Sequence, residues 1–117
     1  MRRRVCAVAE LPPGSMAGFM VGTIPVVVVR TASGALRGVV GRCPHQGGPL
    51  HLGVLGGTTL PSTPGEYRYG REGEIIRCPW HGFEYDSTTG RCLGDPERLR
   101  IRTLDVVASG GDILVDL

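Results

Sequence analysis

Apolar side chains along this chain occur in short runs, rich in β-branched residues, that turn-forming residues interrupt. No stretch repeats apolar positions with a long helical period, and nineteen Gly and nine Pro are distributed through the 117 residues. Several short strands separated by turn signals are typical of an all-β sandwich or small barrel. The runs predicted as strands are Val5–Val8, Phe19–Val21, Ile24–Arg30, Ala35–Gly41, Glu74–Arg77, Phe83–Asp86, Leu99–Val107 and Ile113–Val115.

One stretch, residues 53–73, does not follow this pattern. It is rich in Gly, Thr, Pro and Ser, and Glu66-Tyr67-Arg68-Tyr69 alternates charged and aromatic residues near its centre. This composition predicts a short exposed hairpin with a loop on either side. No linker long enough to separate two domains is present, so residues 1–117 are expected to form one domain.

Charge and hydropathy exclude two function classes. The net charge is only +2, the thirteen basic residues are all Arg and are scattered, and aromatic residues are few, which argues against nucleic-acid binding. No apolar run is long enough to span a membrane. Arg2-Arg3-Arg4 is followed by an apolar stretch that Glu10 stops, so we interpret it as a solvated strand start and expect a cytoplasmic protein.

The candidate chemistry lies in two short motifs, Cys43-Pro44-His45 and Cys78-Pro79-Trp80-His81, which together supply two thiolates and two imidazoles. One iron cofactor is held by two Cys and two His, the Rieske [2Fe–2S] cluster. A tetrahedral zinc site is the alternative, although zinc sites usually pair Cys with Cys and His with His. Cys6 and Cys92 are expected to be buried apolar residues, and His51 is not expected to be a ligand.

The two motifs in their wider context resemble the signature of the Rieske domain family. The matching segments are Cys43–Leu50 and Cys78–Asp86, supported by Glu10–Gly14, Thr89-Gly90 and Gly110–Val115. The resemblance implies an all-β Rieske fold with an antiparallel β-sandwich base. It also implies a small cluster-binding subdomain at the tip, about residues 42–85, in which about 53–73 form an inserted loop or hairpin.

The resemblance also assigns the ligands of one [2Fe–2S] cluster per chain. It implies that Cys43 and Cys78 hold the inner iron, and that His45 and His81 hold the outer iron near the surface. Phe83 stands where high-potential relatives have a serine that hydrogen-bonds a sulfide, whereas Tyr85 matches a tyrosine that reaches a cysteine sulfur. We therefore expect a reduction potential in the lower half of the roughly −150 to +300 mV Rieske range.

The histidine count limits the function. An oxygenase iron needs two His and a carboxylate, and only His51 remains after the cluster has taken two of the three histidines. We therefore expect an electron-transfer protein rather than an enzyme. The predicted role is the ferredoxin component that passes electrons from a flavin-dependent reductase to an oxygenase-type acceptor, with transient contacts near His45 and His81. A small subunit of a nitrite-reductase-like complex and a cluster-based redox sensor remain as alternatives.

Overall fold

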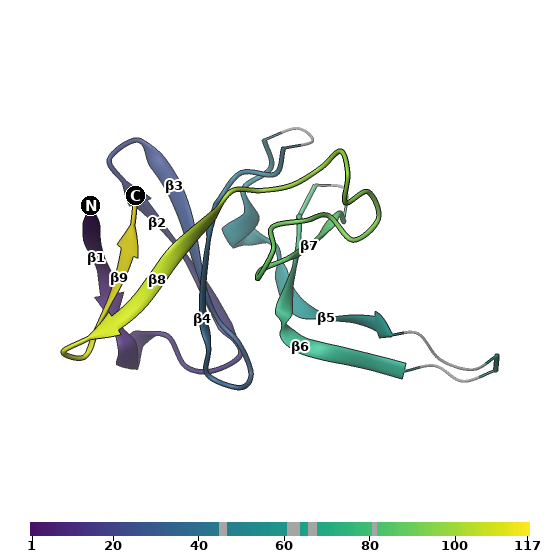
Figure 1. The fold of residues 1–117 in the computed structure, drawn as a ribbon, viewed down its shortest axis with the longest axis horizontal. Helices are drawn as coiled ribbons and strands as arrows, with labels where there is room; N and C mark the ends of the chain where they lie inside the picture. The colour runs from purple at the N-terminus through teal and green to yellow at the C-terminus, as the bar shows by residue number, and fades with distance from the viewer. Residues whose placement is uncertain (45–46, 61–63, 66–67, 81) are drawn as a thin grey trace.

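The computed structural model describes residues 1–44, 47–60, 64–65, 68–80 and 82–117. Within these residues nine strands form two antiparallel sheets, with the order β1-β9-β8-β4-β3-β2 in the larger and β5-β6-β7 in the smaller (Figure 1). The larger sheet contains β1 (Arg2–Ala7), β2 (Ser15–Val21), β3 (Ile24–Arg30), β4 (Leu36–Val40), β8 (Thr103–Ser109) and β9 (Asp112–Asp116). The smaller contains β5 (Val54–Leu60), β6 (Arg68–Arg77) and β7 (Glu84–Asp86), and 3₁₀ turns cover Val8–Glu10 and Leu50–Leu52.

Strand β3 is buried on both faces and joins two hydrophobic cores. Val26 and Val28 pack inside the larger sheet, in a core that includes Cys6 and Ile113. Val27 and Val29 point the other way, into a second core shared with the smaller sheet. Successive side chains of a strand point to opposite faces, so an uninterrupted valine run suits a strand with apolar partners on both sides.

The β5–β6 pair extends away from the rest of the molecule. Strand β7 pairs with Ile75–Arg77 of β6, and in the described part of the chain no third strand flanks the outer part of the β5–β6 ladder. Figure 1 shows these two strands projecting to one side, ahead of residues that lie outside the described ranges. Between these two parts β6 bulges, because Gly56 pairs with Ile75 whereas Thr58 pairs with Gly70.

The sequence predicted the hairpin at 53–73 only in part. Strand β6 enters the predicted stretch at Arg68, and Glu66 and Tyr67 lie outside the described residues. Strand β5 was missed, because Gly56-Gly57-Thr58-Thr59 offers no alternation of apolar and polar residues. Its strand conformation comes from pairing with β6, which is a non-local interaction.

The other predicted strands are present, but several boundaries differ, since β1 begins at Arg2 and β2 at Ser15 rather than at Val5 and Phe19. The arginine triplet does start a strand, since Arg2 pairs with Asp116, and Cys6 and Cys92 are buried. The strand predicted from Leu99 begins only at Thr103. Among the described residues no helix is long and apolar enough to cross a membrane.

The early start at Leu99 was wrong because the backbone there bonds to a different segment. Cys92 N–H donates to Leu99 O at 2.9 Å, and Ile101 N–H donates to Gly90 O at 2.7 Å. A Cβ at Gly90, where φ is +77°, would lie only 2.1 Å from Ile101 O. The contact therefore requires glycine, and residues 99–102 pack against the 90–92 segment before the chain enters β8.

Candidate metal centre

The two cysteines of the motifs are brought together in one buried core. Cys43 follows the end of β4 and Cys78 directly follows β6, and their exposed fractions are 1% and 2%. Both belong to the core that β3 shares with the smaller sheet, together with Tyr85 and Cys92. The fold therefore joins two residues that lie far apart in the sequence.

Cys43 begins a tight turn closed by two backbone hydrogen bonds. Its N–H donates to Gly48 O at 2.8 Å, and Gly47 N–H donates back to Cys43 O at 2.7 Å. Gly47 has a φ of +74°, a left-handed conformation that glycine adopts without steric cost. The turn directs the Cys43 side chain inward while Pro44 and Gly47 remain exposed.

Cys78 begins a turn with the same pattern. Its N–H donates to Phe83 O at 2.8 Å, Gly82 N–H donates to Cys78 O at 3.1 Å, and Gly82 has a φ of +71°. The bonds thus join residues with the same separation along the chain as in the first turn. His45 and His81 fall within these two turns in the sequence and lie outside the described residues.

Tyr85 supplies a hydrogen bond to this centre. The side chain is fully buried, and its hydroxyl oxygen lies 3.1 Å from Cys43 Sγ. Burial, and then the hydrogen bond with Cys43, raise the pKa of the Tyr85 phenol well above its usual range. The phenol therefore keeps its proton and would donate it to a thiolate at Cys43. The contact of this hydroxyl with a cysteine sulfur is the one that the resemblance implied.

The surroundings of the two thiols fit a [2Fe–2S] cluster. A Cβ at Gly48 would lie 2.7 Å from Cys78 Sγ, so glycine keeps the first turn close to the second without covering this sulfur. Unbound thiolates would be unstable in an apolar core, whereas thiols that coordinate a metal are deprotonated. Two buried thiols under matching turns, with one phenol donor, suit the inner iron of such a cluster.

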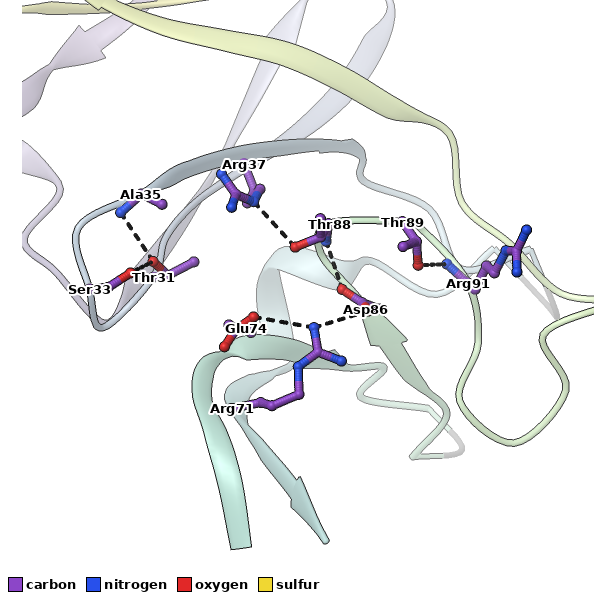
Figure 2. Close-up of polar contacts among 10 residues, drawn as sticks. All are labelled: Thr31, Ser33, Ala35, Arg37, Arg71, Glu74, Asp86, Thr88, Thr89 and Arg91. Atoms are coloured by element: carbon purple, nitrogen blue, oxygen red, sulfur yellow. Dashed lines mark hydrogen bonds and ion pairs between the residues drawn. The ribbon is translucent and has the colours of Figure 1, made fainter. Parts of the chain in front are cut away.

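A polar network next to Tyr85 fixes the base of the projecting hairpin (Figure 2). Arg71 Nη2 lies 3.0 Å from Asp86 Oδ2 and 3.2 Å from Glu74 Oε1. Asp86 also accepts a hydrogen bond from Thr88 N–H at 2.8 Å, and Arg37 Nε donates to Thr88 Oγ1 at 3.2 Å. The network joins the bulge of β6 to the turn after β7 and to β4.

Sequence reasoning did not single out Arg71. Its φ of +58° makes it the only residue other than glycine in the described part of the chain with a positive φ. The only available signal was a charged residue within a glycine-rich stretch, and its partner Asp86 lies fifteen positions further along the sequence. Such a pair becomes visible only once β6 and β7 are placed side by side.

Comparisons with known proteins agree with this geometry. The family model of the Rieske [2Fe-2S] domain matches residues 2–105. The ferredoxin component of biphenyl 2,3-dioxygenase from Rhodococcus jostii (strain RHA1) is 26% identical over 114 residues, which cover 97% of this chain and 91% of that protein. The chain belongs to the Rieske [2Fe–2S] domain family.

Two solved structures extend the likeness. The ferredoxin of carbazole 1,9a-dioxygenase from Nocardioides aromaticivorans IC177 has a TM-score of 0.77 and 30% identity, covering 98% of this chain and 96% of that one. The ferredoxin in a complex of reduced oxygenase and oxidized ferredoxin of carbazole 1,9a-dioxygenase shares the fold, with a TM-score of 0.74 at 22% identity and coverages of 97% and 91%. The predictions of the all-β Rieske fold, the [2Fe–2S] cofactor and a ferredoxin-type electron-transfer protein are confirmed.

Replacing Arg71 with alanine should lower stability clearly, because Asp86 would lose its charged partner while its side chain is only 12% exposed. Leaving a largely buried carboxylate without its cation costs about 1–3 kcal/mol. Thermal unfolding followed by circular dichroism measures the loss as a lower midpoint temperature. Arg77→Ala is the matched control, since its pair with Glu84 is more exposed and is worth at most about 1 kcal/mol. Equal shifts for the two variants would contradict a bracing role for Arg71.

Proposed function

We propose that this protein carries single electrons from a flavin-dependent reductase to an oxygenase-type acceptor, using a cluster held by Cys43, His45, Cys78 and His81. The observation that carries the proposal is the pair of matching turns, each of which buries one cysteine in a common core. Each turn also contributes one histidine in the sequence. The cluster, when bound, supplies a site that accepts and releases one electron.

The chain's own residues separate the thiols from solvent and leave the outer side of the turns accessible. Cys43 and Cys78 face the core, whereas Pro44, Pro79 and Trp80 are exposed, Trp80 by 54%. Histidine ligands on the outer side of such turns would place one iron close to a docked partner. This arrangement supports electron entry and exit at His45 and His81 through transient contacts, which are typical of small redox interfaces.

The partner proposal rests on the relatives. The biphenyl 2,3-dioxygenase and carbazole 1,9a-dioxygenase proteins are ferredoxins of oxygenase systems, and this chain spans nine-tenths or more of each. The ferredoxin of one carbazole system forms a complex with its oxygenase. A cytoplasmic location, where a reductase would be available, is part of the same proposal.

Each of the single substitutions Cys43→Ser, Cys78→Ser, His45→Ala and His81→Ala should abolish the cluster, because one of the two irons would lose one of its two protein ligands. Iron and sulfide analysis, with electron paramagnetic resonance before and after dithionite, measures the loss. The controls are Cys6→Ala, Cys92→Ala and His51→Ala, which should keep the signal. Loss of the Rieske signal in a control that still folds, or zinc in place of iron, would refute the ligand assignment.

Reduction adds negative charge to the cluster, and a hydrogen bond from Tyr85 to Cys43 Sγ stabilises this reduced state. The Tyr85→Phe variant lacks the bond and should therefore have a lower midpoint potential. A net hydrogen-bond contribution of about 1 kcal/mol corresponds to roughly 40 mV for a one-electron couple. Spectroelectrochemical titration measures the change. An unchanged potential with an intact cluster would show that the phenol does not act on the cluster.

The carrier role is tested by reconstitution. In the biphenyl 2,3-dioxygenase system of Rhodococcus jostii, this protein should replace the native ferredoxin in part and restore substrate-dependent product formation from NADH. The cluster-free Cys78→Ser variant, which cannot accept an electron, is the control. If the protein is reduced by the reductase but is not re-oxidised by the oxygenase in the presence of substrate, the oxygenase-type acceptor is wrong.

A further inference from the structure

Three exposed arginines lie together beside the metal centre without acidic partners. Arg91 and Arg100 are directly opposite each other in an isolated antiparallel bridge, and Arg102 follows two positions later. Among the described residues none of the three makes an ion pair or a side-chain hydrogen bond, whereas Arg4, Arg71 and Arg77 have carboxylate partners. We call Arg91, Arg100 and Arg102 the arginine ridge.

The ridge lies directly over the core that holds the two thiols. Leu99 and Ile101 alternate with Arg100 and Arg102 and pack inward, with Ile101 only 5% exposed. Next to Arg91, Cys92 forms a bridge with Tyr85, whose hydroxyl reaches Cys43 Sγ. The two segments that carry the ridge are thus backed by the same core that contains Cys43.

The Arg91 side chain points away from the neighbouring polar contacts. Figure 2 shows that the bond at this residue is made by its backbone, which donates from N–H to Thr89 Oγ1 at 3.2 Å. The guanidinium lies beyond the network that joins Arg71, Asp86 and Thr88. Its charge is therefore available to a molecule that approaches from solvent.

The ridge reduces the stability of the free protein. Like charges directly opposite each other on antiparallel strands are destabilising. Asp95 and Glu97 lie in the same loop, but neither forms an ion pair with a ridge arginine among the described residues. Carboxylates brought by another molecule would remove this repulsion, so the ridge is suited to an acidic surface.

We propose that the arginine ridge is the docking surface for an acidic face of the redox partner, and that it guides this face toward the metal centre. The proposal rests on the electron-carrier function proposed above and adds the chemistry of the partner's surface. Complementary charge mainly increases the association rate, and this increase declines as salt screens the interaction. Three arginines on a chain of net charge +2 suit a protein carboxylate patch better than a nucleic acid.

Stopped-flow oxidation of the dithionite-reduced protein by two small oxidants of opposite charge tests the ridge. Ferricyanide, a trianion, represents the acidic face, and hexaamminecobalt(III), a trication, is the charge-inverted probe. For the unmodified protein the ferricyanide rate constant should fall as ionic strength rises, and the cobalt rate constant should rise. In Arg91→Gln/Arg100→Gln the ferricyanide rate constant at low salt should be about three- to tenfold smaller.

Arg2→Gln/Arg3→Gln is the matched control, because it removes the same charge from β1 at the far edge of the larger sheet. Its ferricyanide rate constant should stay close to that of the unmodified protein, which separates the ridge from net charge. Equal rate constants for the two double variants would overturn the proposal. If dithionite reduces no cluster, or neither oxidant re-oxidises it, the carrier function itself fails.

Competition identifies the kind of polymer that the ridge binds. Poly-L-glutamate at low salt should slow the ferricyanide reaction of the unmodified protein and should have little effect on Arg91→Gln/Arg100→Gln. Poly-L-lysine should not inhibit either protein. Tighter inhibition by single-stranded DNA than by poly-L-glutamate, lost in the same variant, would show a nucleic-acid surface and overturn the proposal of a protein partner.

Discussion

The burial of β3 on both faces is the constraint on which the rest of the structure depends. Val26 and Val28 point into one core and Val27 and Val29 into the other, so this strand contributes fully buried side chains to both cores. A shift of one residue in its register would exchange the two sets of side chains. The same register positions the end of β4, and so the first cysteine turn, because β3 pairs with β4 over Val26–Arg30.

The same kind of backbone turn occurs twice at the metal centre. Each turn begins with a cysteine, closes through the same two backbone hydrogen bonds and contains a glycine with a φ above +70°. The sequences differ in the position of histidine, which is two residues after Cys43 and three after Cys78. Matching turns place equivalent thiols in one core, while the histidine offset and Tyr85 make the two sides of the centre chemically different.

Arginine has two distinct roles around this centre. Arg71 is paired with Asp86 and Glu74 and holds the bulge of β6 against the turn after β7. Arg91 and Arg100 lie nearby, opposite each other and without carboxylates among the described residues. Paired charges at a largely buried site fix a geometry, whereas unpaired charges on the surface extend a field into solvent. Arg71 thus stabilises the fold, whereas Arg91 and Arg100 are suited to bind a partner.

The sequence by itself determined the short strands, the glycine turns and the four candidate ligands. Those features depend on local preference, such as the valine run of β3 or the left-handed glycines next to Cys43 and Cys78, and local preference can be read along the chain. Only the tertiary structure decided that β5 is a strand, that residues 99–102 lie outside β8, and that Arg71 forms an ion pair with Asp86. Each of these features depends on pairing with another segment of the chain, and that pairing is set by tertiary packing rather than by any local pattern.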